Sequence, residues 1–223
     1  MSKPRPTDQL IADAQDHLDA ALGHRFFTEA TDGTLAPEVF HRYLRIEYAF
    51  VDTAARALGR TVHVAPSFER RRDLATALSH LVFEQYDYFH GIAGGLGLRL
   101  PGPDDPVPPL ARPLHDHVLG LAAGGEYLPL LAGSLGAEWL YATWCNAAVR
   151  RPTARDEVLQ QWIELHAGSS FLAHVDWLRA QLDDGLAQAE EETAARCLAA
   201  YIGTVDAEVP FHEAAYVPEP ASD

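Results

Sequence analysis

Apolar residues recur every three or four positions along most of the chain, which is the spacing of one face of an α-helix. No convincing run of alternating β-branched residues, the pattern of a strand, interrupts this spacing. Glycine and proline clusters separate the periodic stretches, notably at Asp32-Gly33 and in the Gly91–Gly97 segment. The pattern predicts seven to eight helices, which cover roughly residues 7–21, 37–59, 67–90, 113–123, 126–149, 156–182 and 186–216.

Helices of this length, joined mostly by short loops, predict a compact all-α bundle. A chain of 223 residues suits one sizeable core better than two separate domains. We therefore expect a single helical domain over residues 1–217 and a disordered tail at 218–223.

Four of the predicted helices carry an ionisable residue within an apolar stripe. Glu47, Glu84, His166 and Glu208 each stand where helical spacing calls for an apolar side chain. A lone buried carboxylate is strongly unfavourable unless it takes up a proton. A group of such residues is stable when its members share protons, bind a metal or line a wet cavity. Their presence on separate helices predicts a polar pocket inside the bundle.

Each of these residues also has a purely structural interpretation. Glu47 could pair with an arginine of another helix, and Glu84 could reach solvent from the edge of its stripe. His166 could be a core histidine with satisfied hydrogen bonds, and Glu208 could extend from the rim of the core into water. The pocket is the better prediction because all four residues occur together.

The formal net charge is −15, which argues against a nucleic-acid partner because binding phosphates requires a basic face. No basic-then-apolar leader opens the chain, and no apolar run approaches ~18 residues, so we expect neither secretion nor membrane insertion. Cys145 and Cys197 are too few for a disulfide framework and lack metal-ligand spacing. A reduced, cytoplasmic location fits these features best.

Five segments combine aromatic and acidic residues in a fixed order along the chain. Residues 40–50 read FHRYLRIEYAF, residues 137–141 AEWLY, residues 162–171 WIELHAGSSF and residues 208–211 EVPF, and Glu84 precedes an aromatic run and LGL. In this order they resemble the TenA (thiaminase II) family, whose motifs are F-x-x-Y-L-x-Q-D-x-x-Y, P-C-x-W-x-Y, W-I-x-x-Y-x-x-x-x-F and E-x-x-F. The resemblance runs from about residue 10 to 216.

The resemblance implies a heme-oxygenase-like helical bundle, a homodimer or homotetramer, and hydrolysis of thiamine or its aminopyrimidine breakdown products. Carried over by position, Glu47 would bind the pyrimidine ring and Glu208 would be the acid/base. Tyr141 and Phe211 would form aromatic walls. The remaining ligand-binding positions of the resemblance fall on Tyr43, Phe50, Glu84, Ala137 and His166.

The chain departs from the family pattern at the nucleophile. Ala137 stands where the family has the attacking cysteine, and Cys145 lies eight residues further, about 12 Å along a helix. Glu138 is beside the missing thiol, about 100° around the helix, and some family members without the cysteine use a carboxylate. Ordinary thiaminase chemistry is therefore not expected.

We interpret the chain as a protein that binds a small heterocyclic amine and requires no cofactor, with Glu208 and Glu47 as catalytic residues of a non-cysteine hydrolase. A second interpretation is a metal-dependent diiron oxidase. Its ligands would come from Glu47, Glu84, Asp87, His90 and His166. A third is a non-catalytic ligand-binding or regulatory protein.

Overall fold

The computed structural model describes residues 5–218, and within them the chain is helical, which confirms the predicted all-α bundle. Only Pro218 of the predicted tail at 218–223 lies within the described residues. The helices are α1 Pro6–Asp13, α2 Gln15–Leu22, α3 Arg25–Asp32, α4 Pro37–Val64, α5 Phe68–Ser79, the π-helix η1 His80–Gln85, α6 Tyr86–Leu96, α7 Arg112–Gly124, α8 Tyr127–Val149, α9 Glu157–Ala167, α10 Ser169–Leu186, α11 Glu191–Glu213 and the 3-10 turn η2 Ala214–Tyr216.

Each predicted helical segment corresponds to one helix or to a run of consecutive helices, and three of the seven segments correspond to such runs. The first comprises α1, α2 and α3, and Gly33 ends α3 with a φ of 72°, a value that glycine adopts readily. The third is the unbroken run α5–η1–α6, and the sixth is α9 followed by α10. Two predicted ends were wrong, because α4 continues beyond Gly59 to Val64 and α6 continues through most of the glycine-rich segment to Leu96.

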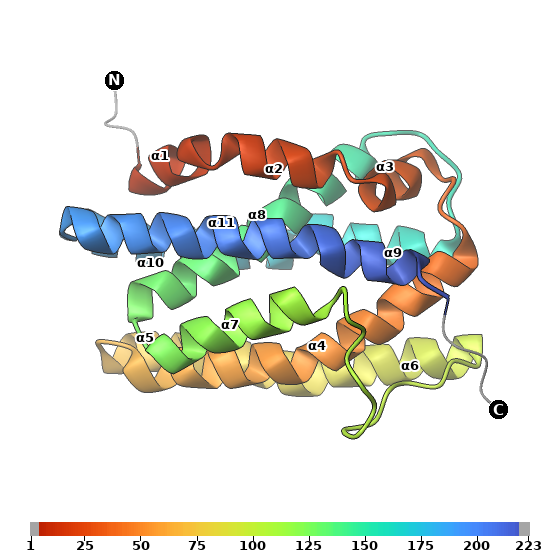
Figure 1. The fold of residues 1–223 in the computed structure, drawn as a ribbon, viewed down its shortest axis with the longest axis horizontal. Helices are drawn as coiled ribbons and strands as arrows, with labels where there is room; N and C mark the ends of the chain where they lie inside the picture. Colours follow the sequence, from red (N-terminus) through yellow and green to blue (C-terminus); the bar gives the residue numbers. More distant parts are fainter. Residues whose placement is uncertain (1–4, 219–223) are drawn as a thin grey trace.

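Helices α8 and α11 form the centre of the bundle and pack closely side by side (Figure 1). Two glycines of α8 permit this approach. A Cβ on Gly136 would lie 2.8 Å from the backbone oxygen of Tyr201, and one on Gly133 would lie 3.3 Å from Thr204 Oγ1. Around this pair, α1, α2 and α3 line one edge, α4 and α7 cover the other, and α9 and α10 pack on α8 (Figure 1).

We call the continuous run α5–η1–α6, residues 68–96, the outer helix. It packs mainly on α4 (Figure 1) and is bridged to the rest of the bundle near both ends. Near its start, Arg70 forms an ion pair of 3.3 Å with Asp184 of α10. Near its end, the Tyr88 and Phe89 rings lie 5.9 Å and 6.0 Å from the Trp162 ring of α9.

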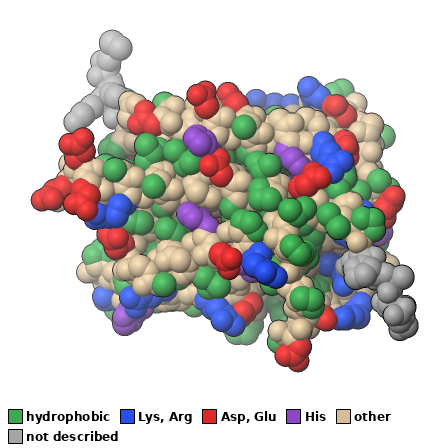
Figure 2. Space-filling model, viewed as in Figure 1, with side chains coloured by type: hydrophobic (Ala, Val, Ile, Leu, Met, Phe, Trp, Pro, Cys, Tyr) green, Lys and Arg blue, Asp and Glu red, His purple; other side chains and the backbone are tan. Residues whose placement is uncertain are grey.

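The surface carries the acidic excess of the chain as scattered side chains. Acidic and basic side chains alternate with apolar ones over the face shown in Figure 2. The longest helices remain too polar to cross a bilayer, and no helix among residues 5–218 qualifies as a membrane span.

Candidate functional site

A cavity of about 910 Å³ lies between the outer helix, α4, and the faces of α7 to α11. It follows α4 from Glu47 to Thr61, a stretch of about 21 Å of helix. We call one end the acidic chamber, lined by Glu47, Phe50, Ala137, Glu138, Tyr141, Trp162, His166 and Glu208. We call the other the apolar channel, lined principally by Val51, Ala54, Leu58, Val118, Leu121 and Leu130.

Glu47 enters the chamber from α4, whose inward stripe also contains Phe40 and the fully buried Tyr43. The side chain is half-buried and faces the cavity, which is partly open to solvent. Burial raises the pKa of Glu47 to about 7. Hydrogen bonds from the Tyr43 and Tyr141 hydroxyls oppose this rise, and the negative charge of Glu138 adds to it.

Glu208 projects from α11 and is only 2% exposed. Burial raises its pKa well above the usual range, and the charges of Glu47 and Glu138 raise it further. Its Oε2 lies 3.4 Å from His212 Nδ1, but that nitrogen is closer, at 2.8 Å, to the Glu208 backbone oxygen. The carbonyl therefore takes the single Nδ1 proton, and Glu208 has no ion pair with a histidine whose pKa burial lowers to about 3.

Tyr43, Tyr141 and His212 form a buried hydrogen-bonded chain beside the carboxylates. Because His212 Nδ1 donates to a carbonyl, its Nε2 is an acceptor. The Tyr141 hydroxyl lies 3.2 Å from this nitrogen and 2.8 Å from the Tyr43 hydroxyl. Both hydroxyls also contact Glu47, and each has a single proton to share among these partners. This chain fixes the Tyr141 hydroxyl at the chamber wall.

Glu138 lines the cavity, although our interpretation of the sequence did not include it among the site residues. It lines the chamber together with Ala137, and burial raises its pKa to about 7. Residues 134, 137, 138 and 141 of α8 all line the cavity, which is the i, i+3, i+4, i+7 pattern of one helix face. The 100° offset from Ala137 therefore leaves Glu138 on the cavity side, and this pattern was visible in the sequence.

Three buried polar atoms of lining residues have no hydrogen-bond partner within residues 5–218. They are Glu208 Oε2, the Tyr88 hydroxyl and Trp162 Nε1. Unpaired buried polar groups are costly and are rare in folded proteins. All three atoms are shielded from the open space of the cavity, so they are polar groups of its wall that no protein atom satisfies.

His166 forms part of the chamber wall as predicted. Its Nδ1 donates to the Trp162 backbone oxygen over 2.8 Å, so the Nε2 is an acceptor. Burial lowers the pKa of His166 to about 4, which keeps the ring neutral at pH 7. The ring centroid lies 4.3 Å from Trp162 and 5.3 Å from Tyr141. Phe50, Ala137 and Tyr141 also line the cavity.

Two predicted ligand contacts lie behind the wall instead. Tyr43 is fully buried and does not line the cavity, because Glu47 and Tyr141 stand between it and the space. Phe211 is also fully buried, with its ring 5.6 Å from that of Phe50, which takes the place at the wall. Both residues support the chamber without facing it.

The prediction that Glu84 points inward was wrong. Its side chain is 71% exposed at the cavity rim and forms an ion pair of 2.6 Å with His80. Asp87 and His90 of the alternative metal set are exposed on the same outer helix, and His90 Nδ1 bonds the Tyr86 carbonyl. The five residues of that set do not come together, and residues 5–218 hold no group of three metal-binding side chains.

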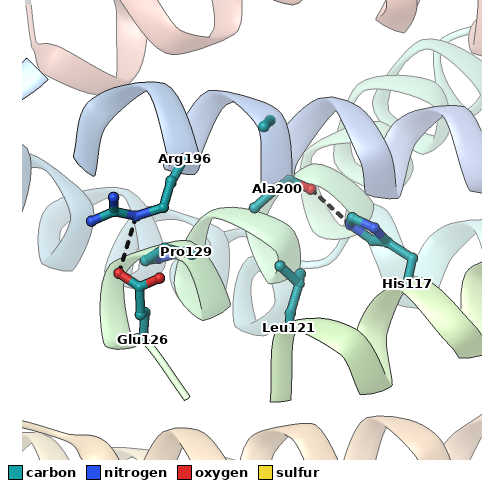
Figure 3. Close-up of a pocket in the computed structure, with 7 residues that line it drawn as sticks. His117, Leu121, Glu126, Pro129, Arg196 and Ala200 are labelled. Atoms are coloured by element: carbon teal, nitrogen blue, oxygen red, sulfur yellow. Dashed lines mark hydrogen bonds and ion pairs between the residues drawn. The ribbon is translucent and has the colours of Figure 1, made fainter. Parts of the chain in front are cut away.

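Two further features lie apart from the cavity. Cys145 is fully buried, and burial raises the pKa of its thiol far above the usual range, so it is not a nucleophile of the site. A shallower hollow of about 230 Å³ lies between α7, α8 and α11 (Figure 3). Its polar groups pair with protein atoms, since Arg196 meets Glu126 at 3.1 Å and His117 Nε2 meets the Ala200 carbonyl at 3.1 Å.

Comparisons with known proteins agree with this architecture. The profile of the TENA/THI-4/PQQC family matches residues 11–217. A TenA homologue from Pyrococcus furiosus is 21% identical with a TM-score of 0.86, covering 95% of this chain and 100% of that one. A TenA homologue from P. horikoshii OT3 is 20% identical with a TM-score of 0.85, over 96% and 99% of the two chains.

A TenA family transcription regulator from Silicibacter sp. TM1040 is also 20% identical with a TM-score of 0.85, over 96% of this chain and 97% of that one. At these identities the structures share the fold of this chain. No curated protein matches the sequence significantly.

Proposed function

The chain belongs to the TENA/THI-4/PQQC family, and from that premise we propose that it binds and hydrolyses a small heterocyclic amine of the aminopyrimidine type in the acidic chamber. The observation that carries the proposal is the meeting of Glu47, Glu138 and Glu208, from three separate helices, at one end of the same cavity. Carboxyl groups that titrate near neutrality are suited to proton transfer at physiological pH.

The chamber matches the chemistry of such a ligand. Burial disfavours the ionised form of Glu47. A protonated ring bound beside it favours that form again, because a nearby positive charge lowers the pKa of a carboxyl group. The half-buried carboxyl groups of Glu47 and Glu138 line the cavity and suit an amino group or a protonated ring nitrogen. Tyr141, His166 and Phe50 give flat walls for an aromatic ring.

The roles of the three carboxyl groups follow from their places. Glu47 anchors the ring, and Glu208, the most deeply buried, donates a proton to the leaving amine. Glu138, beside the alanine that replaces the family's cysteine, takes a proton from an attacking water molecule. The C–N bond breaks, the hydroxyl goes to carbon, and the proton goes to the amine nitrogen. Hydrolysis by this route needs no thiol.

Isothermal titration calorimetry with an aminopyrimidine that carries an aminomethyl group tests the binding half of the proposal. Glu47→Gln should weaken binding by about 10-fold or more, because it removes one charge-assisted hydrogen bond. The matched control is Glu38→Gln, an exposed carboxyl in the first turn of the same helix, which should leave the dissociation constant unchanged. Equal binding by wild type and Glu47→Gln would remove Glu47 from the site.

A further inference from the structure

We infer that the natural ligand is larger than a single ring: its polar head occupies the acidic chamber and an apolar substituent extends along the apolar channel. This inference rests on the proposed function for the position of the head. It adds the class of ligand, an aromatic amine that bears an alkyl or aryl chain.

The size of the cavity is the first argument. Pockets that bind drug-sized molecules measure about 300–1,000 Å³, and the 910 Å³ cavity lies near the top of this range. One ring held between Glu47 and Glu208 leaves most of that space unfilled. From Val51 to Leu58 the channel continues for about 10 Å along α4 beyond the chamber.

The composition of the channel is the second argument. Side chains from α4, α7 and α8 line one side of it with aliphatic groups, namely Val51, Ala54, Leu58, Val118, Leu121 and Leu130, and α10 adds Trp177 and His174 to the cavity wall. Its exposed charged groups, Asp73 and His80, lie on the outer helix at the rim. A ligand that met only the chamber would leave this apolar surface in contact with water, which is unfavourable.

The hydrogen bonds of the channel are the third argument. Four hydroxyl groups line it or its rim, and each donates to the carbonyl four residues earlier in its own helix. The pairs are Thr61 to Ala57 at 2.9 Å, Thr76 to Arg72 at 3.1 Å, Ser134 to Leu130 at 3.1 Å and Thr204 to Ala200 at 3.1 Å. These four hydroxyl protons are therefore already used within the protein and do not select for a polar ligand.

The two ends of the cavity therefore differ in what they can recognise. Carboxyl groups line the chamber, and aliphatic side chains and satisfied hydroxyl groups line one face of the channel. A molecule with a hydrogen-bonding head and an apolar tail satisfies both ends at once. The geometry fixes its orientation, with the tail directed toward Leu58.

Calorimetric titration of the aminomethyl aminopyrimidine and its N-butyl and N-hexyl derivatives tests the inference. Each buried carbon of the chain strengthens binding by about threefold to fourfold, so the butyl derivative, with four carbons, should bind wild type about 80- to 250-fold more tightly than the parent. Ala54→Phe, which fills the channel, should abolish this gain and leave the affinity for the parent within about threefold.

Two variants serve as controls. Ala55→Phe makes the same substitution one residue along α4, at a position that does not line the cavity, and should keep the gain. Leu58→Gln, of similar volume and compatible with a helix, should reduce the gain for the hexyl derivative, and it serves where Ala54→Phe fails to fold.

The outcomes separate the two proposals. If the parent and the butyl derivative bind wild type equally and Glu47→Gln weakens both, the inference is wrong and the proposed function stands. If the alkyl gain disappears in Ala54→Phe but Glu47→Gln has no effect, the channel binds ligand and the proposed head site is wrong. If none of the three compounds binds wild type, both proposals are wrong.

Discussion

The acidic chamber and the apolar channel are two ends of one cavity, built by the same helices. They differ in whether their polar side chains find hydrogen-bond partners within the protein. In the chamber, burial raises the pKa of Glu47 and Glu138 to about 7 and leaves Glu208 Oε2 without a partner. In the channel, the hydroxyls of Thr61 and Ser134 are satisfied by their own helices.

The difference teaches that a few turns of helix suffice to change the chemistry of a cavity. Along α4 the inward face passes from Glu47 to Val51 and Ala54, and along α8 it passes from Glu138 back to Leu130. Folding tolerates unpaired carboxyl groups only where something is gained by them. In the proposed function the chamber is the place of proton transfer, and in the further inference the channel selects the size of the ligand.

The largest expected effect comes from changing the most deeply buried carboxyl of the chamber. Glu208→Gln should lower hydrolytic turnover by about 100-fold or more, because the amide cannot donate a proton to the leaving amine. Ammonia release from the aminomethyl aminopyrimidine measures this, with thermal unfolding as a check on the fold. Turnover equal to that of wild type excludes Glu208 from the mechanism, and binding without turnover in wild type makes the site a binding site only.

The raised pKa values of the chamber carboxyl groups predict that the free energy of unfolding depends on pH. The pKa of Glu47 and Glu138 is about 7 in the folded state, against 4.5 for an ordinary glutamate, so the folded state holds these protons more tightly. Their stabilising contribution is complete below about pH 4.5 and is lost as the pH rises to about 7. The double variant Glu47→Gln, Glu138→Gln should therefore exceed wild type at pH 8 by about 2 kcal/mol or more in free energy of unfolding.

Denaturant titrations from pH 4 to 8 measure this difference. Exchanging the exposed Glu38 and Glu191 for glutamine provides the matched control, which should follow wild type across the range. A constant difference between wild type and the chamber variant at all pH values would contradict the raised pKa values.

The close packing of α8 against α11 fixes the position of the acidic chamber relative to the apolar channel. Gly136→Ala should lower the free energy of unfolding by about 1–3 kcal/mol, since its Cβ would lie 2.8 Å from the Tyr201 backbone oxygen. Gly59→Ala in α4 is the control: no atom lies within 4 Å of the new Cβ, so it should stabilise by about 0.5–1 kcal/mol. Equal effects of the two substitutions would mean that α8 and α11 can move apart at little energetic cost.

The smallest expected effect concerns the outer helix at the cavity mouth. Arg70→Ala removes its ion pair with Asp184 and should change global stability by less than about 1 kcal/mol, because the pair is partly exposed. Amide hydrogen exchange in residues 68–85 should nevertheless accelerate. Arg56→Ala, which breaks an ion pair within α4, should leave that exchange unchanged. Unaltered exchange in Arg70→Ala would show that the aromatic contacts at Trp162 hold the outer helix alone.

Much of the architecture could be predicted from the sequence because helical periodicity survives in long amphipathic segments. Glu47 and Glu208 were found for the same reason, as charges within apolar stripes. Glu84 was misplaced because residues His80–Gln85 form a π-helix, whose wider turn shifts the face that follows it. Periodicity measured from Ala77 and Leu81 could not detect that shift.

Other assignments depended on how deeply a side chain is buried, which the periodicity of one helix does not show. Tyr43 and Phe211 belong to the correct faces but lie one layer behind the wall, whereas Phe50 reaches it. The unpaired atoms of Tyr88 and Trp162 depend on contacts between distant helices. The homodimer or homotetramer and the cytoplasmic location stay predictions.

The central claim, that three carboxyl groups share one chamber, is tested most directly by their titration. Carbon-13 NMR of protein labelled at the glutamate side-chain carboxyl carbon, with assignment by Glu47→Gln, Glu138→Gln and Glu208→Gln, follows each group from pH 3 to 9. We expect Glu47 and Glu138 to titrate near pH 7 and Glu208 well above the ordinary value of 4.5. Glu138→Gln should lower the pKa of Glu47 and Glu208, and Glu47→Gln should lower that of Glu208. Three independent titrations near pH 4.5 would contradict the account.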